Sequence, residues 1–202
     1  MTILPPPLVL ASASRARAQV LEAAGLPCIQ DPSSLDEGVI KAGLLARWTR
    51  TEEAAEALAR AKAEAVSPRH SGAPVIGADQ ILECGGTWFD KPPDAKAAAR
   101  QLGFLSGRTH RLVSAVCVVR DGDRLWHVVE TARLTMRPLS ETAIAAYLEK
   151  AGPEALDSVG AYRLEGLGAQ LFSEIEGDFF AILGLPLLPL LAFLRQHDAG
   201  AF

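Results

Sequence analysis

Short apolar runs and stretches of helical spacing alternate along this 202-residue chain. Residues 8–11 form an apolar run typical of a buried strand, and hydrophobic residues at helical spacing then lead to Gly25 and Pro27, which indicate a helix end. Residues 29–45 are predicted to be a loop. Further strands are predicted at 75–82, 88–89, 112–120, 125–136, 171–175 and 179–183, and further helices at 52–65 (capped by Thr51), 94–102, 140–150 and 185–195.

A carboxylate interrupts the apolar pattern of the stretch from Val75 to Ile81. Val75 and Ile76 are β-branched, two small residues follow, and Asp79 stands where the apolar run should continue. In an open α/β sheet the strand ends face the ligand crevice, so Asp79 is predicted to be a functional carboxylate at the end of a buried strand. The alternative is that Asp79 only caps a turn or the next helix.

Serines and arginines follow the first strand. Backbone N–H groups and hydroxyls converge at a helix N-terminus and a guanidinium can reach over them, so Ser12, Ser14 and Arg17 form a candidate anion site. Arginine in the first turn opposes the helix dipole, so stability alone would not place it there. The alternative, that one serine only caps the helix and the arginines are solvated, remains open.

Two lysines and one acidic pair are further candidates. Lys62 falls on the apolar stripe of the helix 52–65, where it either snorkels or reaches a phosphate site. Lys91 is restrained by the two prolines that follow it. Asp36 and Glu37 precede a glycine, so either a solvated turn or a metal ligand is expected there.

The segment 157–169 interleaves small residues with Tyr162 and Glu165. Glycines admit a flat ring close to the backbone, while a tyrosine and a carboxylate offer a stacking face and a hydrogen-bonding edge. This segment is therefore predicted to be a pocket wall. His110, placed in the turn that precedes the strand 112–120, is interpreted as structural rather than catalytic.

Composition excludes several classes of protein. A net charge of −4 argues against the basic surface that binding of long nucleic acid requires. A small anionic ligand needs only a few cationic side chains and remains possible. Cys28, Cys84 and Cys117 lack metal-type spacing and indicate reduced core residues of a cytoplasmic protein. We expect no signal peptide and no membrane span. The P-loop, nucleophile-elbow and zincin motifs are absent from the sequence.

The remaining candidates share one chemistry. Hydroxyl and cationic donors with a few carboxylates suit metal-assisted attack on a polyphosphate, in which cations hold the charge and an acid holds the metal or orients a water.

Motifs spread over nearly the whole chain resemble the Maf family of nucleoside triphosphate pyrophosphatases. These motifs are Leu-Ala-Ser-x-Ser-x-x-Arg at 10–17, Asp-Glu at 36–37, Lys62, Ile-Gly-Ala-Asp at 76–79, Lys-Pro at 91–92, Leu-Ser-Gly-x-x-His at 105–110, Gly-Ala-Tyr at 160–162, Glu-Gly-x-Gly-Ala at 165–169 and Gly-Leu-Pro at 184–186. The resemblance implies one Maf/Ham1-like α/β domain over residues 1–202, with two lobes and a mixed, elongated, twisted sheet flanked by helices around a central cleft. It also implies a homodimer.

The resemblance implies cleavage between the α and β phosphates of a non-standard nucleotide, a house-cleaning reaction that needs Mg²⁺ or Mn²⁺. Asp79 would be the catalytic carboxylate, with Glu37 and Asp79 at the metal. The substrate-binding residues would be Ser12, Ser14, Arg17, Lys62, Lys91, Gln80 and Glu165.

Gln80 and Glu165 are similar to the 7-methyl-GTP branch of the family rather than the dTTP/UTP branch. A carboxylate can accept two hydrogen bonds from the guanine edge, and its charge suits the cationic methylated ring. Ala16 and Arg15 depart from the residues expected in the serine loop, so a base contact is in question. Two alternatives are a pyrophosphatase with broad or dTTP/UTP preference and a nucleotide-binding regulator of cell division with little catalysis.

Overall fold

One mixed sheet runs through the chain, and the computed structural model describes it for residues 7–47 and 49–197. The sheet has seven strands in the order β2-β1-β3-β5-β6-β7, with β4 paired to β3. The strands are β1 Leu8–Leu10, β2 Cys28–Gln30, β3 Val75–Cys84, β4 Thr87–Phe89, β5 Thr109–Arg120, β6 Asp123–Met136 and β7 Phe172–Glu176.

Strand directions make the sheet mixed. β1 pairs in parallel with β2 and with β3, whereas the pairs β3–β4 and β6–β7 are antiparallel. The helices are α1 Arg15–Ala23, α2 Glu37–Ala46, α3 Thr51–Val66, α4 Ala95–Leu105, α5 Glu141–Ala151, α6 Phe179–Ile182 and α7 Leu187–Gln196. Short 3₁₀ turns are η1 Ser67–Arg69, η2 Gly152–Asp157, η3 Val159–Ala161 and η4 Leu167–Leu171. The expected α/β fold with a mixed sheet and flanking helices is confirmed.

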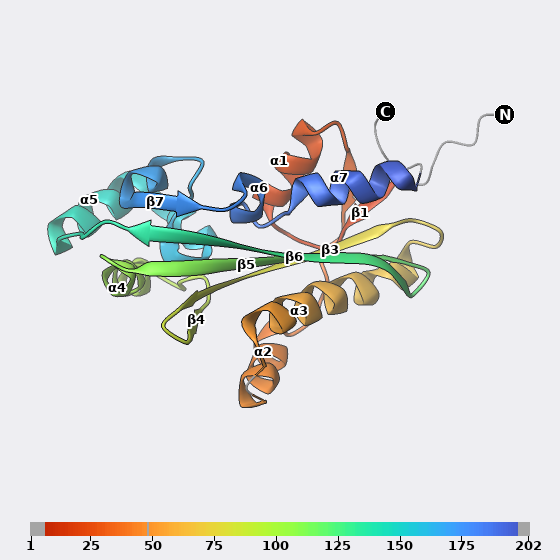
Figure 1. The fold of residues 1–202 in the computed structure, drawn as a ribbon, viewed down its shortest axis with the longest axis horizontal. Coiled ribbons are helices and arrows are strands. Elements are labelled where there is room, and N and C mark those ends of the chain that lie inside the picture. Colours follow the sequence, from red (N-terminus) through yellow and green to blue (C-terminus); the bar gives the residue numbers. More distant parts are fainter. Residues whose placement is uncertain (1–6, 48, 198–202) are drawn as a thin grey trace. The chain divides into compact units, whose positions relative to one another are not determined.

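The described residues form two compact units. Each of the long strands β3, β5 and β6 has one part in the first unit and the other part in the second. The first unit contains the described residues up to Gln80, Ser114–Glu130 and those from Gly184 onward. The second unit contains Ile81–Val113 and Thr131–Leu183. In the first unit, α3 lies on one face of the strands and α1 and α7 lie on the other (Figure 1).

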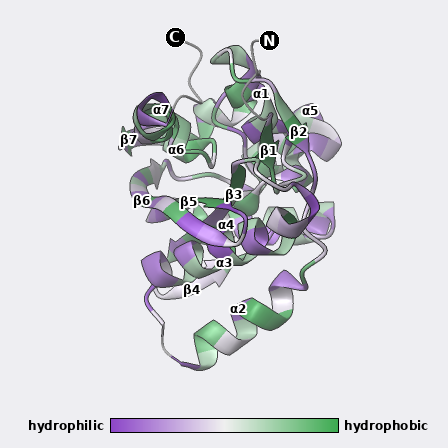
Figure 2. Cartoon of the chain, turned by 90° about the vertical axis from the view of Figure 1, so that its right-hand side faces the viewer, coloured by the Kyte–Doolittle hydropathy of each residue, from purple (hydrophilic) through white to green (hydrophobic). Residues whose placement is uncertain are grey.

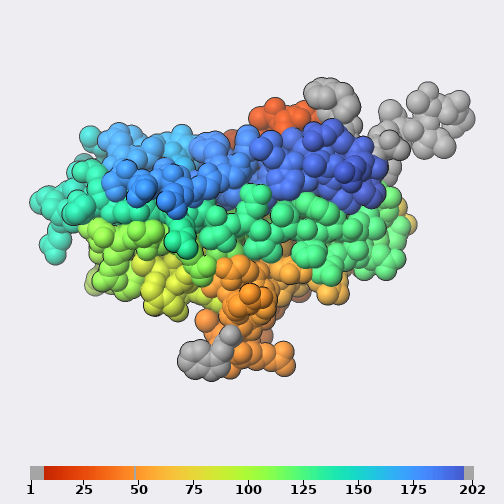
Figure 3. Space-filling model, viewed as in Figure 1, coloured from red at the N-terminus to blue at the C-terminus, as the bar shows by residue number. Residues whose placement is uncertain are grey.

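The first unit is held together by apolar packing on both faces of its strands. Val9, Leu10 and Ile76 are fully buried, and Trp126 of β6 stacks on Phe193 of α7 with ring centroids 5.2 Å apart. The helix α2 differs, because none of its residues is buried and Val39 remains 69% exposed. The cartoon of α2 contains several hydrophobic residues (Figure 2). The space-filling view shows both α2 and α7 at the surface of this unit (Figure 3).

The second unit has its own core between α4, β5, β6 and the 3₁₀ turns. Its fully buried side chains include Leu82, Leu102, Leu134 and Met136. Gly160, with a φ of +79°, allows η3 to pack closely, since a Cβ there would lie 2.6 Å from Leu82 Cδ1.

Two of the element predictions are wrong. The predicted loop 29–45 contains β2 and α2, because Asp36 caps a helix by accepting from Val39 N. None of the residues of α2 is buried, although Val39, Ile40, Leu44 and Leu45 are apolar. The predicted strand 179–183 is the short helix α6, because the side chain of Asp178 accepts from Ala181 N and begins a helical turn.

Smaller corrections concern helix α3, the cysteines and the termini. Arg50, not Thr51, occupies the N-cap position of α3, and Thr51 is its first residue. All three cysteines are free, but Cys28 is only half-buried. Within residues 7–47 and 49–197, no helix has the length and apolar character that crossing a membrane demands. The expectation about a signal peptide concerns mainly residues 1–6, which lie outside the described part of the chain.

Candidate active site

Asp79 lies in the middle of β3, not at its end. The strand continues to Cys84, because Leu82 to Cys84 pair with β4 across the turn at Gly85 and Gly86. Both predicted placements, at a strand end or as a cap, are therefore wrong. Successive side chains of a strand point to opposite faces, so Gly77 and Asp79 share the face that α3 covers. Asp79 is only 3% exposed.

Lys62 pairs with Asp79 inside the first unit. Its Nζ lies 2.7 Å from Asp79 Oδ1, and the side chains of Lys62 and Asp79 are 8% and 5% exposed. Gly77 allows this approach, because a Cβ at that position would overlap the carbonyl oxygen of Ala59 on α3. The alternative that Lys62 snorkels to solvent is wrong, since the ammonium is buried in an ion pair.

Glu37 joins this pair from the N-terminus of α2. Its Oε1 lies 2.9 Å from Lys62 Nζ, and the side chain is 44% exposed. The neighbouring Asp36 has a different role, because its carboxylate caps α2 by accepting from Val39 N, whereas that of Glu37 pairs with Lys62. One ammonium thus holds two carboxylates from distant parts of the sequence, a cluster that we call the Lys62 cluster.

Arg17 and Ser12 form a second buried network. The guanidinium donates from Nη1 to Ser12 Oγ (3.0 Å) and to the carbonyl oxygen of Ala78 (2.8 Å), and from Nε to the carbonyl oxygen of Gly184 (2.8 Å). Burial lowers the pKa of Arg17, while the charges of Asp79 and Glu37 raise it. Arg17 is 9% exposed, so the interpretation that it is a solvated arginine is wrong.

Ser14 is the N-cap of α1, and its hydroxyl accepts from Arg17 N at 3.4 Å. Ser12 lies two residues before Ser14, and its hydroxyl accepts a hydrogen bond from Ser14 N at 3.3 Å. The capping alternative is therefore confirmed for Ser14. Gln30 of β2 donates to the carbonyl oxygens of both serines, which fixes the loop that carries them.

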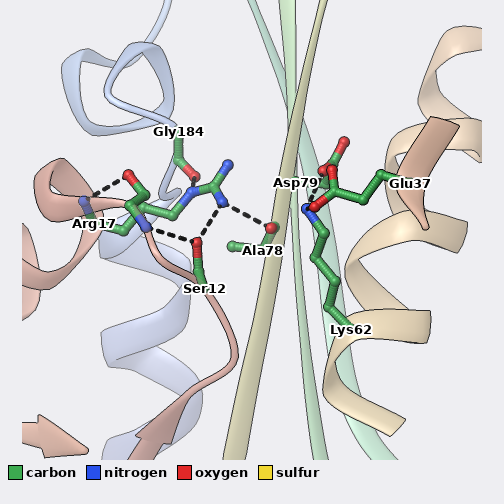
Figure 4. A network of polar contacts seen from close by, with 8 residues as sticks. Ser12, Arg17, Glu37, Lys62, Ala78, Asp79 and Gly184 are labelled. Atoms are coloured by element: carbon green, nitrogen blue, oxygen red, sulfur yellow. Dashed lines mark hydrogen bonds and ion pairs between the residues drawn. The ribbon is translucent and has the colours of Figure 1, made fainter. Parts of the chain in front are cut away.

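The two networks lie on opposite sides of β3 (Figure 4). Arg17 and Ser12 approach the strand from the side of α1 and α7, whereas Lys62 and Glu37 approach it from the side of α3. The carbonyl of Ala78 and the side chain of Asp79 thus belong to adjacent residues but serve different networks. Of the predicted donors, Lys62 contacts Asp79 directly, and Arg17 reaches the residue before it.

The Lys62 cluster fits a divalent metal ion. Asp79 Oδ2 is buried and has no hydrogen-bond partner, although an unsatisfied buried acceptor costs desolvation energy. No three histidine, cysteine or acidic side chains gather into a metal-type group within the described residues. Mg²⁺ commonly takes only one or two carboxylates and completes its shell with substrate phosphates and water. Asp79 and Glu37 supply that number of carboxylates.

Gln80 points away from Asp79, to the other face of β3. Its Nε2 donates to Ser114 Oγ on β5 at 2.9 Å, and Ser114 is fully buried. The amide of Gln80 therefore has a fixed orientation. Ser114 carried no sequence signal, because a serine within an apolar strand predicts no particular role.

Lys91 and Glu165, the other two predicted site residues, belong to the second unit. Lys91 is exposed and lies between β4 and α4. Glu165 is paired with Arg163, whose Nε lies 2.8 Å from Glu165 Oε1. Sequence reasoning missed Arg163, although its position two residues before the acid was visible.

The predicted pocket wall at 157–169 is partly a core element. Tyr162 is 2% exposed, and its hydroxyl lies 2.7 Å from His110 Nε2. His110 belongs to β5, not to the preceding turn, and burial lowers its pKa to about 4. The structural interpretation of His110 therefore holds, whereas the exposed stacking face expected of Tyr162 is wrong. Apolar packing against Phe172, at a centroid distance of 4.8 Å, overrides the small residues around it.

Gly184 is a further residue whose role the sequence did not indicate. It has a φ of +87°, and its carbonyl oxygen accepts from Arg17. A Cβ there would lie 3.3 Å from both Nε and Nη2 of Arg17, so the turn before α7 is shaped around the guanidinium.

Comparison with known proteins gives a consistent result. The family model described as Maf-like protein matches residues 7–197. A nucleoside triphosphate pyrophosphatase of Paramagnetospirillum magneticum is 53% identical over 189 residues, which cover 94% of this chain and 97% of the relative. Another protein of that name, from Nitrobacter hamburgensis, is 55% identical and covers 96% of this chain and 95% of its own. A 7-methyl-GTP pyrophosphatase of Rhizobium etli is 51% identical, covering 95% of this chain and 96% of its own. The chain therefore belongs to the Maf family.

Proposed function

We propose that this protein is a nucleoside triphosphate pyrophosphatase, a hydrolase that cleaves the bond between the α and β phosphates and releases pyrophosphate and a monophosphate. The observation that carries this proposal is the Lys62 cluster, with its buried, unpartnered Asp79 Oδ2. The names of the relatives, which share about half of their residues with this chain over nearly its full length, support the same reaction.

The residues divide the chemistry between them. Lys62 holds Asp79 by Oδ1, so Oδ2 is left as the oxygen that would hold the metal ion together with Glu37. A divalent metal ion held by Glu37 and Asp79 would supply positive charge against the phosphates as the bond breaks. By the family resemblance we assign Ser12, Ser14 and Arg17 of the first unit to the triphosphate, and Arg17 also holds the carbonyl oxygen of Ala78, next to Asp79. Lys91 of the second unit is a further candidate cation.

For the base, we propose a guanine of the 7-methyl kind. Glu165 would accept from the two N–H groups of the guanine edge, and its negative charge would favour the cationic ring. Gln80, oriented by Ser114, would contribute a further contact to the nucleotide. The name of the Rhizobium relative agrees with this choice. The reaction would remove modified nucleotides from the cytoplasm, and the three free cysteines fit that reducing location.

Broad base tolerance is the second candidate. Arg163 already engages Glu165, so the carboxylate meets a ligand with part of its charge neutralised. The generic names of the other relatives also fit an enzyme without a strong base preference.

A nucleotide panel with identification of the products tests these proposals. Incubation with 7-methyl-GTP, GTP, ATP, dTTP or UTP and Mg²⁺ or Mn²⁺ should release pyrophosphate and the monophosphate, fastest for 7-methyl-GTP. Asp79→Asn should lower turnover by about 10²-fold or more while nucleotide still binds. Asp123→Asn, at an exposed position on β6, serves as the control.

Three outcomes would contradict parts of the proposal. Release of orthophosphate would mean that a different bond is cut. Saturable nucleotide binding without any product would indicate a regulatory binding protein. Full activity of Asp79→Asn would remove Asp79 from the mechanism. Size-exclusion chromatography of the same preparation tests the homodimer that the family resemblance implies.

A further inference from the structure

Glu165 is the acid through which the proposed function recognises the base, and it is not an isolated carboxylate. Arg163 Nε lies 2.8 Å from its Oε1, and the same guanidinium contacts Glu154 through Nη1. One cation is thus shared by two acids. The hydrogen bond with Glu165 also raises the pKa of Arg163, so the guanidinium keeps its charge in this group.

The backbone around Arg163 is tightly folded, and this places Arg163 and Glu165 close to each other. Gly166 N donates to the carbonyl oxygen of Arg163 at 3.2 Å. Gly168 folds back onto the same peptide, where a Cβ would lie 2.8 Å from Arg163 N. This tight turn brings the side chains at 163 and 165 side by side, so the backbone conformation favours their contact.

The contact changes what Glu165 can offer a ligand. A guanine edge presents two N–H donors and is matched by both oxygens of a carboxylate, but Oε1 already accepts from Arg163. A neighbouring positive charge also repels a cationic ring, such as 7-methylguanine, more than a neutral one. The engaged oxygen affects GTP and 7-methyl-GTP alike, whereas the positive charge reduces the advantage of the methylated base.

We infer that Arg163 is a positioning residue for base selection, which tunes the preference between cationic and neutral bases by engaging Glu165. This inference rests on the proposed function, since it requires Glu165 to face the base. Removing the guanidinium should sharpen the preference for 7-methyl-GTP over GTP. Because the pair is partly exposed and screened by solvent, the ratio of the two kcat/KM values should rise by about twofold to fivefold.

The test compares Arg163→Met with wild type for 7-methyl-GTP and GTP at low and high salt. The rise in the ratio should shrink at high salt, because screening weakens the charge effect. Arg163→Lys keeps the charge and should give a ratio between the two. Arg124→Met is a matched control: Arg124 pairs with Glu56 at 2.7 Å with side chains 37% and 29% exposed, against 37% and 27% for Arg163 and Glu165. Its ratio should equal that of wild type.

A double-substitution cycle identifies the route of the effect. In the Glu165→Gln background, Arg163→Met should raise the ratio less than in the wild-type background, since only the direct repulsion between the guanidinium and the cationic ring is left to remove. An equal rise in both backgrounds, or none in the wild-type background, would overturn the inference. Equilibrium binding of 7-methyl-GMP and GMP to the same variants gives the ratio without turnover. If the wild-type protein released no pyrophosphate but Arg163→Met still shifted the ratio of the two binding constants, the proposed reaction would be rejected and the role of Arg163 retained.

Discussion

Gly77→Ala should lower both the free energy of unfolding of the protein and its kcat. An added Cβ would overlap the carbonyl oxygen of Ala59 and lie 2.8 Å from Ala63 N and 2.9 Å from Ala63 Cβ. Backbone atoms of a helix cannot rotate away, and the added Cβ would lie far inside the contact distance of the Ala59 oxygen, so α3 must move from the sheet by about 1 Å. Overpacking of this kind costs about 1–3 kcal/mol. The loss of unfolded-state freedom on replacing glycine recovers only about 0.4–1 kcal/mol.

The same displacement moves the lysine of the site. Lys62 lies on α3 between Ala59 and Ala63, and its 2.7 Å contact to Asp79 must lengthen or reorient. Misplacement of a catalytic group by about 1 Å can cost about 10²-fold in rate, so kcat should fall by about 10²-fold. The loss in kcat should accompany the loss in stability.

Urea denaturation and pyrophosphate release together measure the effect. Gly43→Ala in α2 is the matched control, because nothing lies within 4 Å of its added Cβ. It should stabilise its helix by up to about 1 kcal/mol and leave turnover unchanged. A Gly77→Ala protein with the unfolding midpoint and kcat of wild type would refute the claim that this glycine sets the distance between α3 and β3.

Further predictions concern the buried charges and the core. Lys62→Met should lower the free energy of unfolding by about 3–5 kcal/mol, because it strands the buried Asp79; adding Asp79→Asn should restore part of this, and a purely additive double variant would argue against the pair. Gly184→Ala should destabilise by about 1–3 kcal/mol in urea, since φ is +87° and the methyl group would press on Arg17; no change would contradict that strain. His110 is buried with a pKa lowered to about 4 from an ordinary 6.5, so the unfolded chain binds its proton first as pH falls. Stability should drop by about 2 kcal/mol from about pH 7.5 to about pH 5. His110→Gln should lose this part of the pH dependence, and an unchanged slope would refute it.

Local patterns predicted the buried elements. A continuous apolar run before Asp79 identified β3, which is buried on both faces, and the apolar stripe that includes Lys62 identified α3. The helix α2 buries no residue although Val39, Ile40, Leu44 and Leu45 are apolar, and the pairing of Glu37 with Lys62 depends on the fold and could not be anticipated.

Tertiary contacts decided the roles that spacing left open. Asp79 was expected at a strand end, yet the hairpin to β4 extends the strand beyond it. Tyr162 stood among small residues typical of a pocket, yet His110 and Phe172 enclose it. Family resemblance identified most of the clustered residues, including Gly184, whereas Arg163 and the contact of Gly184 with Arg17 required the three-dimensional arrangement.

The carbonyl of Ala78 links the environment of Arg17 to the carboxylate of Asp79 through a single peptide unit. Natural variation in the turn before α7 can therefore alter the rate of the reaction by displacing the guanidinium of Arg17. Laboratory evolution of this scaffold should recover rate-changing substitutions at that turn, more than one hundred positions along the chain from the acid they affect.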